Sequence, residues 1–134
     1  MRSLVFLSEE SVFSGTIKCG IAEVVDRLAT SLTENYNVTI VCLDGNGEAG
    51  RAAADFYEIE KGVSYAKFLK VNYFLIQHEL WPQKGIELIN QSKFDIFHNF
   101  YLPKIIEELN YTPSQSVFTF DEEKILYDNL DCLG

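Results

Sequence analysis

The sequence predicts an α/β domain of three layers, with a mostly parallel sheet of four to six strands and a Rossmann-like arrangement. Short apolar segments rich in β-branched residues alternate along the chain with longer segments of helical periodicity. The chain has 134 residues, 47% of them hydrophobic, which is enough for one core. No linker or internal repeat divides it, so residues 1–134 are expected to form a single domain.

The strand and helix segments follow one another in the order of βαβ units. The apolar run 3–7 is short and ends at polar residues, as a buried strand does. Residues 21–32 place their apolar side chains on one helical face, and residues 65–80 are taken as a helix because the segment is long and apolar. Strands are predicted at 3–7, 37–43, 94–100 and 116–120, with a shorter one at 55–60, and helices at 21–32, 65–80, 84–92, 103–109 and from Asp121 onward.

Charge and composition exclude several classes of function. The formal net charge of −9 argues against binding to nucleic acid or to anionic lipid, and no segment approaches the roughly 18 apolar residues of a membrane span. Cys19, Cys42 and Cys132 are widely spaced and form no C-x-x-C motif, which favours reduced thiols in a cytoplasmic protein. The two histidines, His78 and His98, are twenty residues apart, so no metal site is expected. No cofactor is predicted either.

The loop after the first predicted strand is the clearest candidate site. It reads "SGTIKCG" and leads into the helix at 21–32. In doubly wound folds ligands sit at the carboxyl ends of the strands, and a helix N-terminus offers free N–H groups to a phosphate. Gly20 would let the backbone approach such a phosphate, and Lys18 would add a positive charge. The alternative is a plain connection whose glycines ease a turn and whose lysine is solvated.

Three segments in the same order resemble a known family. "KCGIAEVVDRLATSL" (18–32) is similar to the first loop and helix of GT-B glycosyltransferases, which reads K-T-G-G-L-A-D-V-V in glycogen and starch synthases of family 5 and C-G-I-A-E in some relatives of family 4. "FDIFHNFYLP" (94–103) resembles their D-[IV]-[IV]-H-x-H strand, and "SVFTF" (116–120) resembles the next strand, V-x-T-x-H. The chain thus resembles a shortened N-terminal half of such an enzyme.

The resemblance implies an acceptor-side domain of an enzyme that transfers glucose from ADP- or UDP-glucose to a glucan. A second domain or subunit would hold the nucleotide and complete the cleft. The loop residues Lys18, Cys19 and Gly20 would then approach the diphosphate, and His98 would be the catalytic candidate. Candidates on the acceptor side are Gly15, Asn99, Tyr101 and Asp121.

The sequence also departs from the family pattern. Cys19 stands where a glycine is expected, Phe100 replaces the second histidine of H-x-H, and Asp121 replaces the histidine of V-x-T-x-H. We therefore expect the chain alone to be inactive. The alternative function is a stand-alone, non-catalytic module, derived from that domain, that binds a glycan or a protein.

Two further motifs have competing interpretations. "GNGEAG" (45–50) matches G-x-G-x-x-G but follows the second strand, so a surface loop is favoured over a dinucleotide site. Residues 121–123 are acidic and either begin a helix or supply a general base. The seven tyrosines and ten phenylalanines form a ring-rich core, a surface for sugars, or an interface with another domain.

Overall fold

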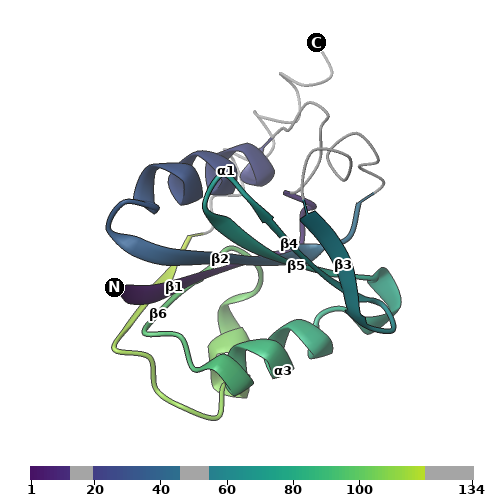
Figure 1. The fold of residues 1–134 in the computed structure, drawn as a ribbon. Coiled ribbons are helices and arrows are strands. Elements are labelled where there is room, and N and C mark those ends of the chain that lie inside the picture. The colour runs from purple at the N-terminus through teal and green to yellow at the C-terminus, as the bar shows by residue number, and fades with distance from the viewer. Residues whose placement is uncertain (13–19, 46–54, 120–134) are drawn as a thin grey trace.

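The computed structural model describes residues 1–12, 20–45 and 55–119. These residues contain one seven-stranded sheet (Figure 1). The side chains of Ile21, Asp55 and Phe56 are outside that description. The strands are β1 (Arg2–Ser8), β2 (Tyr36–Leu43), β3 (Asp55–Glu60), β4 (Val63–Phe68), β5 (Val71–Ile76), β6 (Ile96–Asn99) and β7 (Gln115–Phe118). The predicted α/β class is confirmed, but the predicted range of four to six strands was wrong.

Five strands form the parallel part of the sheet. Their order is β5-β2-β1-β6-β7, and β3 and β4 extend the β5 edge as antiparallel strands. Numbered along the chain, the parallel strands lie in the order 3-2-1-4-5, which is compatible with the Rossmann-like arrangement expected from the sequence. β1 lies at the centre, where Phe6 is aligned with Ile40 of β2 and with His98 of β6.

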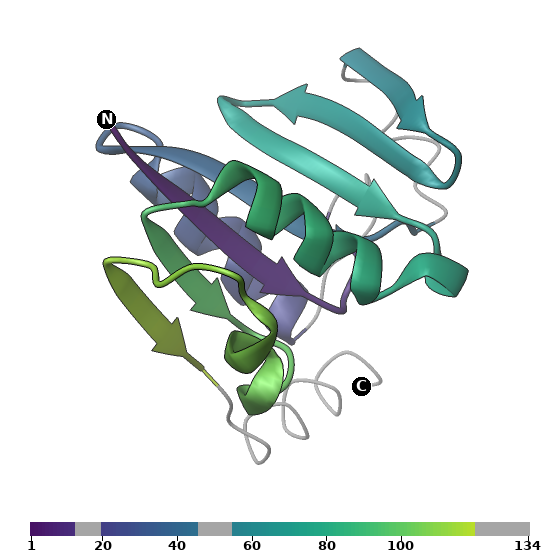
Figure 2. The same ribbon diagram turned by 90° about the horizontal axis from the view of Figure 1, so that it is seen from below.

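Helices cover both faces of the sheet. α1 (Ile21–Leu32) lies on one face, and α3 (Gln83–Ser92) lies on the other, together with the 3₁₀ segment η2 (Pro103–Glu108) (Figures 1 and 2). Gly85 of α3 faces Leu7, Val41 and Ile76, and its lack of a side chain lets the helix pack close to the sheet. Among the described residues no helix is both long and apolar enough to cross a membrane.

Alternation of the strand residues divides the core into two clusters, one on each face of the sheet. The cluster under α1 includes Leu4, Phe6, Val25, Ala29, Ile40, Tyr73 and Phe100. The cluster under α3 includes Val5, Leu7, Val41, Ile76, Ile86, Ile89 and Phe97.

The helix predicted over 65–80 was wrong. This segment contains most of β4, all of β5 and the short 3₁₀ turn η1 (His78–Leu80). The two strands form a tight hairpin whose turn residues, Leu69 and Lys70, both have positive φ, at 50° and 68°. Such turns normally use asparagine or glycine, so the sequence carries no turn signal here and its apolar residues look like one long helix.

Most of the remaining predicted helices and strands are confirmed. The helices at 21–32 and 84–92 are confirmed, and so are the strands at 3–7, 37–43, 55–60, 94–100 and 116–120, with small shifts in their ends. Residues 103–108 form a 3₁₀ helix rather than the α-helix predicted over 103–109, because the Ile105 amide bonds to the Leu102 carbonyl and the Leu109 amide to the Ile106 carbonyl, each three residues back. The helix expected from Asp121 lies outside the described residues.

The β4–β5 turn gives a test of this fold. Lys70→Gly is expected to stabilise the protein by about 1 kcal/mol, because a positive φ strains every residue with a Cβ atom. Urea unfolding measures the change. The matched control is Lys61→Gly in the β3–β4 turn, where φ is not positive, so no gain is expected. Equal effects of the two substitutions would contradict the assigned turn.

Candidate functional site

The candidate site lies at the carboxyl ends of β1 and β6. The chain leaves β1 toward α1 on one face of the sheet and leaves β6 toward η2 on the other (Figure 1). In open parallel sheets this divergence opens a crevice at the carboxyl edge, and ligands bind there. The residues that begin α1 and those that follow β6 therefore form the natural lining of a site.

Gly20 forms the N-terminus of α1. It is buried, and its φ of 59° and ψ of −131° belong to a region that glycine adopts and other residues avoid. The first helical hydrogen bond runs from the Val24 amide to the Gly20 carbonyl, at 3.3 Å. Because Gly20 has no side chain, it cannot cap the amides of the first turn. A phosphate or sugar oxygen could accept hydrogen bonds from those amides.

His98 projects from β6 toward the face that α1 covers. Its ring stacks on Phe100, with 4.2 Å between ring centroids, and lies 5.2 Å from the ring of Phe6. The Nε2 atom is 2.7 Å from the hydroxyl oxygen of Thr119. Burial lowers the pKa of His98 to about 4. The imidazole is therefore neutral at pH 7, where it can exchange hydrogen bonds but carries no charge for a phosphate.

Asn99 organises the loop that follows β6. It is 2% exposed, and its Nδ2 donates a hydrogen bond to the Leu102 carbonyl at 2.6 Å. Its Oδ1 accepts a hydrogen bond from the Tyr101 amide at 2.8 Å. Both ends of the side chain are thus used within the loop, so Asn99 shapes the site more than it offers groups to a ligand.

Tyr101 lies beyond the end of β6, where it meets a residue that the sequence analysis did not select. Its ring packs edge-on against Trp81, with 5.5 Å between centroids. Trp81 lies between η1 and α3, and its Nε1 atom is buried with no hydrogen-bond partner in the described part of the chain. The only sequence signal for it was a Trp-Pro pair just before a predicted helix.

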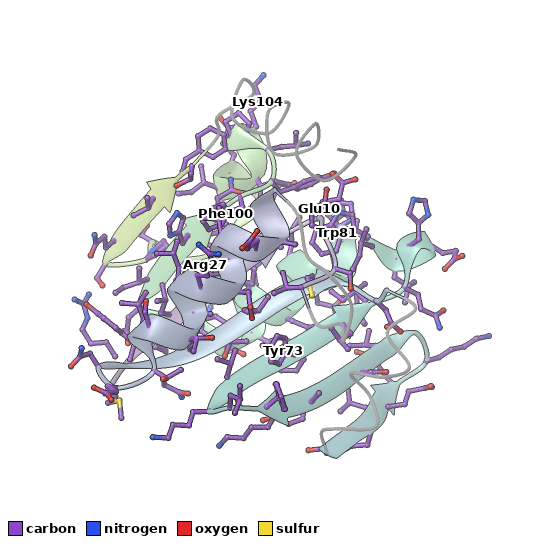
Figure 3. All side chains as sticks on the ribbon, turned by 90° about the horizontal axis from the view of Figure 1, so that it is seen from above. Glu10, Arg27, Tyr73, Trp81, Phe100 and Lys104 are labelled. Carbon is purple, nitrogen blue, oxygen red and sulfur yellow. The ribbon has the colours of Figure 1, made fainter. Side chains whose placement is uncertain are left out.

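The sheet separates the predicted site residues into two groups. His98 lies on the α1 side and Tyr101 packs against the cluster on the α3 side, while the Asn99 side chain points away from α1. Figure 3, seen from above, shows Phe100 beside α1. Gly20 is the one member of the predicted loop that is described. Gly15, Lys18, Cys19 and Asp121 lie outside the described residues.

Within the described ranges, no group of three or more histidine, cysteine, aspartate or glutamate residues is placed to hold a metal ion. Comparisons of the chain with protein-family models, with curated proteins and with solved structures gave no match. A function for this chain is therefore inferred from the geometry of the site and from the three segments that resemble GT-B glycosyltransferases.

His98 gives a pH-dependent prediction. Its pKa falls from 6.5 in the unfolded chain to about 4 in the folded protein, so between these values the unfolded state binds the extra proton. The free energy of unfolding is therefore expected to decrease as the pH falls from 6.5 toward 4. Because the ring is partly exposed, we expect a loss of about 1–2 kcal/mol from this residue.

Urea unfolding at pH 7 and at pH 4.5 tests this, with His98→Gln as the variant. The variant keeps a hydrogen-bonding group but has no ring to protonate, so it should lose less stability on acidification than the parent protein. His78→Gln, at an exposed histidine, is the control and should behave as the parent does. Identical pH dependence of all three proteins would contradict the role of His98.

Proposed function

We propose that this chain is the acceptor-side domain of a glycosyltransferase of the glycogen-synthase type, which transfers glucose from ADP- or UDP-glucose to a glucan. The proposal is supported by the three resembling segments and by the Rossmann-like strand order. The observation that carries it is the position of Gly20. This glycine opens α1 at the carboxyl edge, directly after the loop that follows the central strand.

In this proposal the first turn of α1 faces the diphosphate of the nucleotide-sugar. Backbone amides at a helix N-terminus stabilise negative charge, and Gly20 keeps their approach open. Lys18 adds a positive charge from the preceding loop. The chain itself contacts the diphosphate, and a second domain or subunit holds the rest of the nucleotide and completes the cleft, which is why the chain alone is expected to bind a nucleotide-sugar weakly and to transfer no glucose. The widely spaced cysteines favour a cytoplasmic location.

A second candidate function is a stand-alone module that binds a glycan without catalysis. It is favoured by the surroundings of His98. Phe100, which stands where the family has its second histidine, is 4% exposed and packs on the His98 ring. This position therefore presents a packed apolar ring and no polar group. His98 itself is neutral at pH 7 and contacts Thr119.

Titration of the ¹⁵N-labelled chain separates the two candidates, with ADP-glucose, UDP-glucose and maltoheptaose as probes. A glycosyltransferase domain is expected to show amide shifts at Gly20 and Ala22 with a nucleotide-sugar, and at Tyr101 with maltoheptaose. Lys18→Ala should weaken nucleotide-sugar binding about tenfold, because a charged hydrogen bond is lost. Lys61→Ala changes an exposed lysine in a distant turn and should have no effect.

Each result has a defined meaning. Shifts with maltoheptaose and none with either nucleotide-sugar would favour the non-catalytic module. An absence of shifts with all three probes would overturn both candidates. Glucose transfer by the purified chain alone would contradict the expected need for a second domain.

A further inference from the structure

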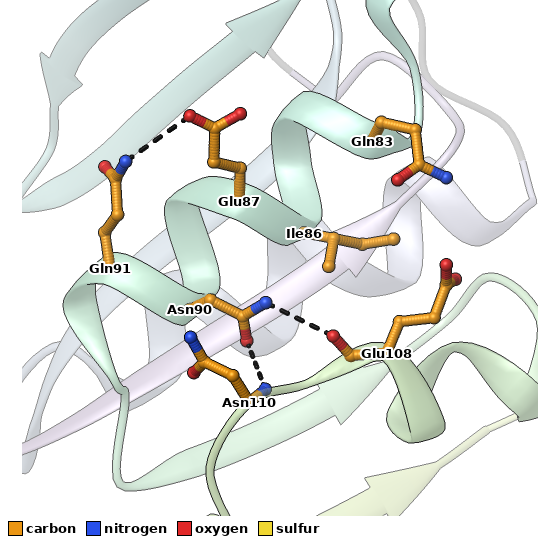
Figure 4. Close-up of a pocket in the computed structure, with 7 residues that line it drawn as sticks. All are labelled: Gln83, Ile86, Glu87, Asn90, Gln91, Glu108 and Asn110. Carbon is orange, nitrogen blue, oxygen red and sulfur yellow. Dashed lines mark hydrogen bonds between the residues drawn. The ribbon is translucent and has the colours of Figure 1, made fainter.

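A polar pocket lies between α3 and the C-terminal end of η2 with the residues that follow it. Its volume is about 400 Å³, which is in the range of small-molecule sites. Figure 4 shows that α3 forms one wall, from Gln83 to Gln91, and that Glu108 and Asn110 form the other. The pocket therefore joins two segments that are far apart in the sequence.

Hydrogen bonds hold the two walls in place. The Nδ2 atom of Asn90 donates to the Glu108 carbonyl at 3.2 Å, and its Oδ1 accepts from the Asn110 amide at 2.8 Å (Figure 4). The Oδ1 of Asn110 in turn accepts a hydrogen bond from Lys93 at 3.1 Å. Ile86, which is 4% exposed, supplies an apolar patch to the lining. The pocket is therefore formed before any ligand arrives.

The lining favours a neutral ligand that is rich in hydroxyl groups. It consists of amide and carboxylate side chains around Ile86, and no lysine, arginine or histidine is among the lining residues. Two lysines border the pocket, Lys93 bonded to Asn110 and Lys84 paired with Glu87, but the lining itself carries two carboxylates and no cation, which favours a neutral ligand over an anion. Amides both donate and accept hydrogen bonds and carboxylates accept them, which suits sugar hydroxyls that do both.

Two lining side chains keep their hydrogen-bonding capacity for a ligand. In the described part of the chain, the Gln83 amide and the Glu108 carboxylate form no hydrogen bond with another residue. Glu87 is different, because it pairs with Lys84 at 3.3 Å and accepts from Gln91 at 3.4 Å. Gln83 and Glu108 are thus the groups best placed to bind a sugar.

We propose that this pocket binds a glucose unit of a glucan chain, at a subsite outside the carboxyl-edge crevice. This inference rests on the proposed function, in which a glucan is the acceptor. Gln83 begins α3 two residues after Trp81, whose ring meets Tyr101 at the carboxyl edge. The pocket therefore begins next to the Trp81–Tyr101 pair, on the α3 side of the sheet.

The test uses the whole chain and maltoheptaose, observed through the side-chain amide signals of Asn90, Gln91 and Asn110. These signals are expected to shift on titration. Gln83→Ala and Glu108→Ala should each raise the apparent Kd at these signals about tenfold. Glu107→Ala removes a neighbouring exposed carboxylate that does not line the pocket, and should leave the Kd unchanged.

The outcomes separate this inference from the proposed function. The subsite is supported if the pocket signals shift with maltoheptaose and their apparent Kd rises in Gln83→Ala and in Glu108→Ala but not in Glu107→Ala. Shifts at Tyr101 with none at the pocket amides would overturn the subsite and leave the glucan acceptor in place. Equal weakening in all three variants would also overturn the subsite, because Glu107 does not line the pocket and its loss should not affect a ligand bound there.

Discussion

The structure depends on the burial of β1 at the centre of the sheet. Val5, Phe6 and Leu7 are fully buried, and β1 pairs in parallel with β2 on one side and with β6 on the other. Phe6 faces the α1 cluster, whereas Val5 and Leu7 face the α3 cluster. One strand thus takes part in both halves of the core, and the order of all the other parallel strands is defined relative to it.

The alternation of side chains along β6 also shapes the candidate site. Because consecutive residues of a strand point to opposite faces, His98 and Asn99 are neighbours in sequence and lie on different sides of the sheet. The His98 ring is partly buried, and this burial lowers its pKa to about 4, whereas the Asn99 side chain enters the loop before η2. A ligand that met both would have to pass over the carboxyl edge itself. This edge is also where Gly20 opens α1.

The sequence predicted the parallel part of the fold because each of its strands and helices has a hydrophobic pattern that is typical of that element alone. Residues 4–7 form a continuous apolar run, and the apolar residues of 21–32 repeat at helical spacing. The β4–β5 hairpin was missed because Leu69 and Lys70 occupy a turn that normally requires other residues. In the site, the glycine at position 20 was predictable from its place after the first strand. Trp81 and the pocket along α3 were not, since both depend on contacts between distant segments.

Many aromatic side chains pack against one another, and this packing affects where a sugar could bind. Tyr57, Tyr65 and Phe74 form a row across β3, β4 and β5 with 5.5 Å between neighbouring ring centroids. Those rings are tilted against one another, whereas His98 and Phe100 are stacked, with 4.2 Å between their centroids. Rings that already pack against rings have less surface for a sugar to stack on. Recognition of a glycan would therefore rely more on amide and carboxylate groups, and these gather along α3, outside the aromatic clusters.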